Sequence, residues 1–253
     1  MKLQDHAEEA VEHLTAADKR LAKLIAKAGP PDIKWSEQER PFDGLLRTIV
    51  YQQLAGAAAA KIHGRVVDLL PKAKTKRPQA LLDLPEDDLR GAGLSANKLK
   101  SVRDLAEKTV DGTVPTLSRL HKMSDQEVLE RLTAVRGIGE WTVHMLLMFQ
   151  LGRPDVLPVG DYGVQKGFML TYKTDELPKP KQMIAHAEKW RPYRSVASWY
   201  MWRAVDLAGG KMVLPKAEAK KAAKKPASKK SKSRPKNSTP KKRKSSTARQ
   251  RRG

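Results

Sequence analysis

Two short stretches carry the residue types that could do chemistry in this sequence. One is the turn Gly137-Ile138-Gly139, between two segments whose apolar residues recur at helical spacing; the other is Asp161, directly after a loop with Pro and Gly over 154–160. A Gly-x-Gly turn before a helix lets a phosphate approach the main chain and the helix N-terminus. A carboxylate that starts a helix can cap it, or can stabilise positive charge that develops on a substrate.

The Gly-x-Gly turn is interpreted as a clamp for a DNA backbone. Gly137, Gly139 and Thr142 are the candidate phosphate contacts, with unusual φ values expected at both glycines, and Ile138 is expected to plug the turn into the core. The alternative is a plain helix–turn–helix connection without a ligand. A clamp of this kind positions DNA without reading its sequence.

Aromatic residues follow the turn and cluster in the last helical segment. Trp141 follows the turn, while Trp199, Tyr200 and Trp202 lie in the last helical segment, which runs over 193–208. Electron-rich rings suit a cationic ligand, because a cation over a ring face is attracted electrostatically. The alternative for each ring by itself is an ordinary place in the hydrophobic core.

From about Phe42 to Leu207 the sequence resembles the helix-hairpin-helix DNA glycosylase superfamily, and within it the alkylbase (3-methyladenine type II) glycosylases. The resemblance implies that Asp161 is the catalytic acid and that Trp141 and Trp202 line the base pocket. Met145 stands in that pocket where the family pattern has a Tyr. Arg194 resembles a family Arg that supports the catalytic carboxylate or contacts DNA.

The resemblance also implies three further features of this chain. Leu54 is the candidate wedge, which fills the hole left by a flipped base, although it fits a helical core stripe as well. Trp141 occupies the position of the Lys that forms a Schiff base in bifunctional relatives. Backbone carbonyls of Thr133, Val135 and Ile138 are the candidate ligands of a structural Na⁺ or K⁺ at the hairpin.

The function that these residues predict is a monofunctional DNA glycosylase of base excision repair. Such an enzyme flips an alkylated purine of the 3-methyladenine and 7-methylguanine class and hydrolyses its N-glycosidic bond, which leaves an abasic site. No cofactor is required for this hydrolysis. Two alternatives stay open: a glycosylase for oxidised or deaminated purines on the same fold, and a DNA-packaging protein without catalysis in which Asp161 only caps a helix.

The charge of the 253-residue chain, +22, is unevenly distributed. From Lys216 onward there are 17 Lys and Arg residues and one acid, so this segment alone carries +16. We interpret 215–253 as a disordered DNA-binding tail, since polycations release counterions from phosphates. A solubilising tail is the alternative. The chain has no Cys, which excludes disulfides and cysteine-ligated metals.

The elements expected from periodicity are all helices. They include a helix over 1–28 and a second helix after Pro41, with the Ala-rich stretch to Ala60 as its continuation or as a close neighbour. A further helix is capped by Ser95, and another begins with a capping box at Ser124. We therefore expect an all-α, two-lobed glycosylase domain over 1–214, with its hairpin at about 128–150 and the active-site cleft between the lobes. Duplex DNA with alkylated bases is the expected partner of a monomer. Without a signal peptide or a membrane span, an intracellular, DNA-associated location is expected, in a bacterial nucleoid or, in a eukaryote, the nucleus.

Overall fold

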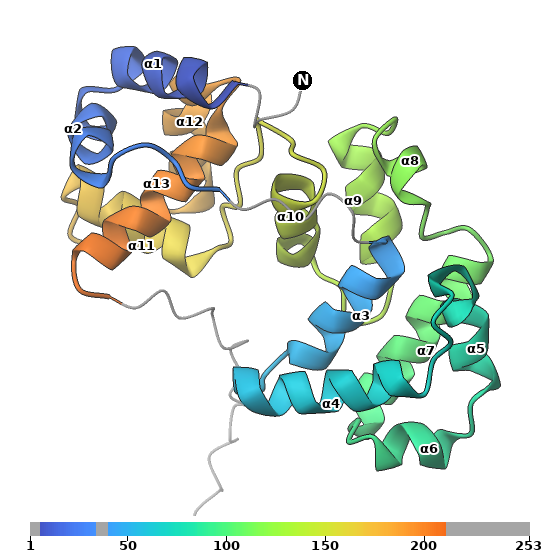
Figure 1. The fold of residues 1–253 in the computed structure, drawn as a ribbon. Coiled ribbons are helices and arrows are strands. Elements are labelled where there is room, and N and C mark those ends of the chain that lie inside the picture. Colours follow the sequence, from blue (N-terminus) through green and yellow to red (C-terminus); the bar gives the residue numbers. More distant parts are fainter. Residues whose placement is uncertain (1–5, 34–39, 211–253) are drawn as a thin grey trace, which may run out of the picture. The chain divides into compact units, whose positions relative to one another are not determined.

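A computed structural model describes residues 6–33 and 40–210, and this part of the chain consists of helices and turns with no β-strand (Figure 1). The basic tail predicted at 215–253 lies outside the described residues. No helix in the described part is long and apolar enough to cross a membrane. The elements are α1 (Ala7–Ala17), α2 (Lys19–Ala28), α3 (Pro41–Tyr51), α4 (Gly56–Asp68), η2 (Lys74–Lys76), α5 (Arg77–Asp83), α6 (Glu86–Gly91), α7 (Ala96–Val110), α8 (Leu117–Leu120), α9 (Asp125–Thr133), α10 (Glu140–Phe149), α11 (Tyr162–Tyr172), α12 (Pro180–Ala187), η3 (Glu188–Trp190) and α13 (Arg194–Leu207).

The closest helix pair in the described part is α11 and α13, which lie side by side in Figure 1. Gly163 and Gly167, one turn apart on α11, face α13 where the two helices cross. A Cβ atom at Gly167 would lie 1.9 Å from the carbonyl oxygen of Met201, far inside van der Waals contact. The crossing is therefore possible only because Gly167 has no side chain.

A buried carboxylate, Asp18, separates α1 from α2, so the predicted single helix over 1–28 is wrong. Asp18 has extended backbone angles, and its side chain caps α2 through the N–H groups of Arg20 and Leu21. It also accepts hydrogen bonds from Tyr172 Oη at 2.6 Å and Trp190 Nε1 at 3.2 Å. Burial pushes the pKa of Asp18 upward, but these hydrogen bonds outweigh burial and hold the pKa well below its ordinary value.

Another group of packed helices comprises α3, α4, α5, α6 and α7. Of the two alternatives for the Ala-rich stretch, the structure shows a close neighbour, α4, which a turn over 52–55 separates from α3. Gln53 in this turn adopts a left-handed φ of 58°. Two caps predicted from the sequence are confirmed: the side chain of Ser95 accepts a hydrogen bond from Lys98 N, and Ser124 forms a reciprocal capping box with Glu127. The second cap begins α9, the first helix of the hairpin.

Replacing Gly167 by Ala should destabilise the protein strongly, because the new Cβ meets backbone rather than a side chain that could move. We expect a loss on the order of 1–3 kcal/mol or more in the free energy of unfolding, measured by urea denaturation. The matched control is Gly64→Ala within α4, where an added Cβ meets nothing within 4 Å. That variant should be as stable as the parent or up to about 1 kcal/mol more stable. Equal stability of the two variants would contradict this account of the crossing.

Candidate active site

Asp161 ends the irregular loop that follows α10 and caps α11. Its backbone is extended, and Oδ1 accepts a hydrogen bond of 2.7 Å from the N–H of Val164. The sequence left two alternatives for this residue, a helix cap or a catalytic acid, and the cap is present. The side chain is nevertheless buried, with a relative exposure of 3%, which is rare for a carboxylate that serves only as a cap.

Two tryptophans bind the two oxygens of the Asp161 carboxylate. Trp202 Nε1 on α13 donates to Oδ1 at 2.8 Å, and Trp141 Nε1 at the start of α10 donates to Oδ2 at 2.7 Å. With the bond from Val164, three of about four lone-pair positions are used. One position is left for a water molecule or a substrate group, while the plane of the carboxylate is fixed by donors from three separate segments.

Gly163 makes the contact between Trp202 and Asp161 possible. A Cβ atom at this position would lie 2.7 Å from Cδ1 of Trp202 and 3.0 Å from Oδ1 of Asp161. Real side chains do not tolerate such distances, so any other residue would force the indole away from the carboxylate. Gly163 is thus part of the site, although it offers no reactive group.

The three predicted pocket residues differ in exposure. Trp202 is buried and stacks on Phe149, with ring centroids 5.9 Å apart and an interplanar angle of 27°. Trp141 and Met145, one turn apart on α10, are half-buried. One face of the Trp202 ring is therefore covered by Phe149, and Trp141 and Met145 leave part of their surface open.

The predicted hairpin is present as α9, a turn and α10. Gly137 in the turn has a left-handed φ of 82°, and its carbonyl accepts a hydrogen bond of 2.8 Å from Gln52 Nε2. Ile138 is buried in the core as expected. Asp104 of α7 accepts a bond of 2.7 Å from the N–H of Arg136. These bonds fix the turn against the end of α3 and against α7.

Gly139 and Thr142 differ from expectation in detail. Gly139 is the N-cap of α10 with an ordinary extended backbone, φ −103° and ψ 170°, so the expected unusual φ applies to Gly137 alone. Thr142, an expected phosphate contact, is buried. The first intrahelical bond runs from Val143 N to the Gly139 carbonyl. The N–H groups before Val143, rather than the Thr142 hydroxyl, are thus available to a phosphate.

Residues 46–192 match the family described as HhH-GPD superfamily base excision DNA repair protein. This match covers more than half of the chain. The chain belongs to this superfamily. The predicted all-α, helix-hairpin-helix fold is thereby confirmed.

Relatives and solved structures with substantial identity are similar to this superfamily member over most of its length. DNA-3-methyladenine glycosylase 1 of Schizosaccharomyces pombe is 35% identical over 81% of this chain and 90% of its own. The crystal structure of a DNA-3-methyladenine glycosidase from Bacillus halodurans is 37% identical, with a TM-score of 0.71, over 79% of this chain and 91% of that one. A structure of the S. pombe 3-methyladenine glycosylase in complex with abasic DNA is 32% identical, with a TM-score of 0.64, and covers 80% of this chain and 99% of its own.

Leu54 of this HhH-GPD protein lies in the turn between α3 and α4 and not in the core. Its relative exposure is 39%, which sets aside the alternative of a core stripe. Gln52, two residues earlier, holds Gly137, so the turn that carries Leu54 is bonded directly to the hairpin. The sequence did not indicate this bond, because 85 residues separate its partners.

Arg194 has a partner other than the expected one. Its guanidinium forms a two-bonded ion pair with Asp155, with Nε–Oδ1 at 2.6 Å and Nη2–Oδ2 at 3.0 Å. The family resemblance left two roles open for Arg194, support of Asp161 and a contact with a DNA phosphate. The structure brings Asp155 to Arg194 because the loop before Asp161 packs against the start of α13, while Asp161 receives its hydrogen bonds from indoles.

The carbonyl groups predicted to hold a monovalent cation lie at the end of α9 and in the hairpin turn. The carbonyl of Val135 accepts a 3.0 Å bond from Ile138 N, which leaves a second lone pair, and the hydroxyl of Thr133 turns back to Leu129. Carbonyls at a helix C-terminus attract cations, and a monovalent ion at this hairpin stays a prediction from the family resemblance. In residues 6–33 and 40–210 no cluster of three or more His, Asp or Glu side chains could hold a metal.

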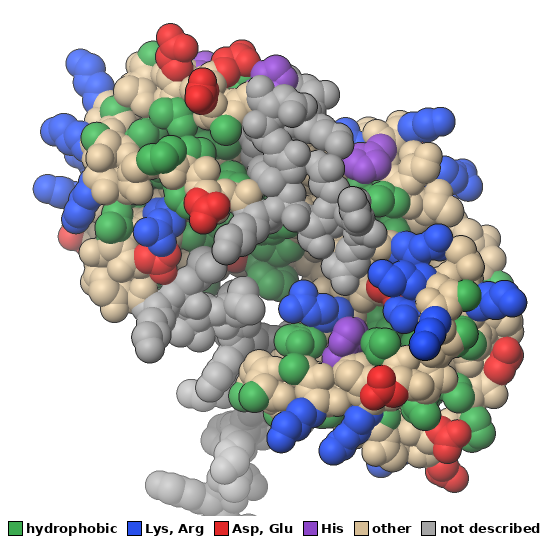
Figure 2. Space-filling model, in the orientation of Figure 1, with side chains coloured by type: hydrophobic (Ala, Val, Ile, Leu, Met, Phe, Trp, Pro, Cys, Tyr) green, Lys and Arg blue, Asp and Glu red, His purple; other side chains and the backbone are tan. Residues whose placement is uncertain are grey.

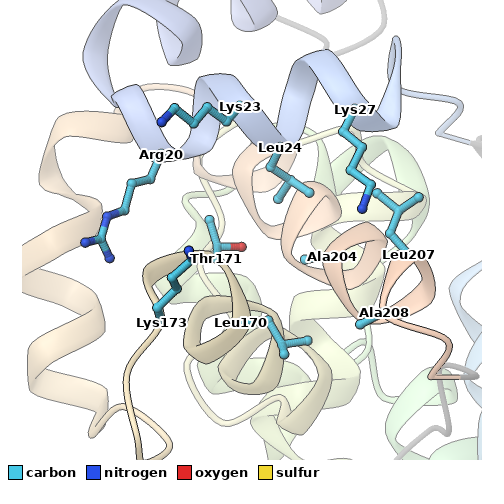
Figure 3. A pocket seen from close by; sticks show the side chains of 10 residues that line it. All are labelled: Arg20, Lys23, Leu24, Lys27, Leu170, Thr171, Lys173, Ala204, Leu207 and Ala208. Carbon is cyan, nitrogen blue, oxygen red and sulfur yellow. The ribbon is translucent and has the colours of Figure 1, made fainter.

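Two cavities lie apart from the residues around Asp161. The larger, about 580 Å³, lies among α2, α11 and α13; its charged lining residues are Arg20, Lys23, Lys27 and Lys173 (Figure 3). Lys and Arg side chains also gather on the surface over α2 and over α4 (Figure 2).

The smaller cavity, about 320 Å³, includes His144 on the helix that carries Trp141. Burial lowers the pKa of His144, with Glu140 opposing the shift.

Replacing Gly163 by Ala should disconnect Trp202 from Asp161 and reduce base excision. The new Cβ would occupy the space of the indole edge, so the Trp202 N–H can no longer reach Oδ1. We expect a loss on the order of 10- to 100-fold in the single-turnover rate of base release, typical of a misplaced catalytic group. Gly56→Ala at the start of α4, where a Cβ meets nothing within 4 Å, is the control and should keep the parental rate. If folded Gly163→Ala protein excised bases at the parental rate, the contact between Trp202 and Asp161 would not be needed for catalysis.

Proposed function

We propose that this HhH-GPD protein is a monofunctional DNA glycosylase that removes alkylated purines of the 3-methyladenine and 7-methylguanine class. The names of the relatives that share 35% and 37% of its residues support this substrate class. The single observation that carries the proposal is the buried Asp161 carboxylate, whose two oxygens are bound by the N–H groups of Trp141 and Trp202. Superfamily membership sets aside the alternative of a packaging protein.

Asp161 acts on the sugar in this proposal. As the N-glycosidic bond breaks, positive charge grows on C1′, and a fixed carboxylate stabilises that transition state more than the ground state. The indoles and the Val164 N–H hold the carboxylate in place before the substrate arrives. The remaining lone-pair position of Asp161 orients the attacking water.

The leaving base needs little help from the protein. A purine alkylated at N3 or N7 is already cationic, so it departs as a neutral base without a strong general acid. The half-buried ring of Trp141 offers a π face to this cation, and Met145 supplies an adaptable apolar wall. Trp202 contributes mainly its N–H, because Phe149 covers one face of its ring.

DNA is held and opened by the hairpin and by the α3–α4 turn. Phosphates of one strand bind the N–H groups at the start of α10. Such phosphate contacts position the DNA on the protein but do not read its sequence. Leu54, exposed in its turn, enters the stack in place of the flipped base. Because Gln52 bonds Gly137, the wedge and the clamp keep a fixed spacing.

The competing substrate class is an oxidised or deaminated purine. Such a base is neutral, so it would gain little from the Trp141 face and would need a general acid. Release of 3-methyladenine and 7-methylguanine, compared with release of 8-oxoguanine from matched duplexes, separates the two. The monomeric state, the compartment and a DNA-binding role of 215–253 remain predictions from the sequence.

Asp161→Asn should preserve folding and duplex affinity and remove most excision. The amide is neutral, so it cannot stabilise the charge on the sugar, and we expect the single-turnover rate to fall on the order of 100-fold or more. Asp206→Asn on α13, which changes an Arg-paired surface carboxylate in the same way, is the control and should be fully active. Near-parental turnover by folded Asp161→Asn protein would refute the catalytic assignment.

Borohydride should trap no covalent complex between this protein and damaged DNA. Trp141 has no amine with which to attack C1′, so the product strand should stay intact until alkali cleaves it at the abasic site. A bifunctional glycosylase/lyase on its own substrate serves as the positive control for trapping. An adduct formed in stoichiometric yield would contradict the monofunctional assignment.

A further inference from the structure

The loop between α10 and Asp161 has no regular secondary structure, so its backbone groups need partners elsewhere. Over 153–156 most of those partners come from two consecutive residues at the start of α13. Ser195, which has no solvent exposure, binds three loop residues, and Arg194 binds a fourth. The loop segment 153–156 is therefore held by one short stretch of chain.

Every hydrogen-bonding group of Ser195 that faces the loop is used. Its hydroxyl donates to the carbonyl of Arg153 at 2.7 Å and accepts from Val156 N at 2.9 Å. Its backbone N–H donates to the carbonyl of Pro154 at 2.9 Å. Removing the hydroxyl would leave a buried carbonyl and a buried N–H without this partner, which costs more than the loss of a surface hydrogen bond.

Arg194 adds charge to the same contact. Besides its ion pair with the Asp155 carboxylate, Nη2 donates to the Asp155 carbonyl at 3.0 Å. The side chains of Arg194 and Asp155 are 14% and 23% exposed, so solvent weakens the pair only in part. A two-bonded pair also fixes direction, because the guanidinium plane must match the carboxylate.

The helix that anchors the loop also binds the residue at the loop's end. Trp202, seven residues after Ser195 on α13, donates to Asp161 Oδ1. On the other side, Nη2 of Arg153 donates to the Met123 carbonyl at 2.7 Å, just before α9 begins. The loop thus connects the DNA-binding hairpin to α13, with Asp161 at its end.

We propose that Ser195 and the Arg194–Asp155 pair are positioning residues of the glycosylase: they set the place of Asp161 relative to Trp141 and Trp202. This inference rests on the proposed role of Asp161. None of the three anchoring residues touches the Asp161 carboxylate, so they act through the loop backbone. Loosening 153–156 moves Asp161 away from its indole donors while the hairpin continues to bind DNA.

The test uses full-length Ser195→Ala and Asp155→Asn proteins, with Asp206→Asn as the matched control on the same helix. Single-turnover release of 7-methylguanine should slow on the order of 10- to 100-fold in the first two, at unchanged duplex affinity. The Asp206→Asn protein should keep the parental rate. A rate loss with intact affinity separates positioning from DNA binding.

A second readout, independent of activity, is the ¹H–¹⁵N signals of the indole N–H groups in substrate-free protein. The Trp141 and Trp202 signals should move in Ser195→Ala and Asp155→Asn. The Trp190 signal should stay, because its N–H bonds to Asp18 and serves as an internal reference for folding. A protein that is merely less stable would keep all three signals at a temperature where it is folded.

Parental rates in both variants, or slowed rates with unmoved Trp141 and Trp202 signals, would overturn the proposal. If Ser195→Ala does not fold, the Asp155→Asn protein tests the proposal by itself. This variant should fold, because Asp155 is partly exposed and the hydrogen bonds of Ser195 are kept. Failure of the proposed function looks different. In that case the parent protein would release no 7-methylguanine, or Asp161→Asn would release it at the parental rate, whatever the indole signals of Ser195→Ala show.

Discussion

The close crossing of α11 and α13 is the constraint on which the site depends. Gly167 lets the backbone of α13 approach α11, and Gly163 leaves space for the edge of the Trp202 indole beside the start of α11. Because Asp161 caps α11, the distance between the two helices also sets the distance between the indole N–H and the carboxylate. Any side chain at Gly163 or Gly167 would change both packing and chemistry.

Burying a carboxylate is costly unless hydrogen bonds replace the water it loses. Residues 6–33 and 40–210 contain three buried carboxylates, Asp18, Asp43 and Asp161, and the first and the last differ in their hydrogen bonds. At Asp18 a dense set of donors that includes Tyr172 and Trp190 joins helices far apart in the sequence, a structural role. At Asp161 the described donors are the indole N–H groups of Trp141 and Trp202 and the backbone N–H of Val164. Buried Asp43 has Arg77 as its described donor, so the identity of the donors, rather than their number, sets Asp161 apart.

The elements proposed to contact DNA share one hydrophobic core with the segment around Asp161, and hydrogen bonds add to that connection. Gln52 connects the wedge turn to the hairpin, and Arg153 connects the region before α9 to the loop of Asp161. Hydrogen bonds have directional geometry, so they fix positions more narrowly than apolar packing does. The proposed reaction on a flipped nucleotide needs such precise placement of the protein groups. The phosphates, the space left in the base stack and the sugar of the flipped nucleotide lie at fixed distances along the DNA.

The sequence by itself determined the helical class and the hairpin, and its family resemblance singled out Asp161, Trp141 and Trp202. The helical class and the hairpin are local properties, since apolar spacing, caps such as Ser124 and the Gly-x-Gly turn depend on neighbours within a few residues. Only the tertiary structure decided that Arg194 pairs with Asp155, that Leu54 is exposed and that α1 and α2 are separate helices. The partners in the Gln52–Gly137 bond and the Ser195–loop contacts lie about 40 to 85 residues apart. Local periodicity carries no information on such pairs, because the packing of whole helices brings them together.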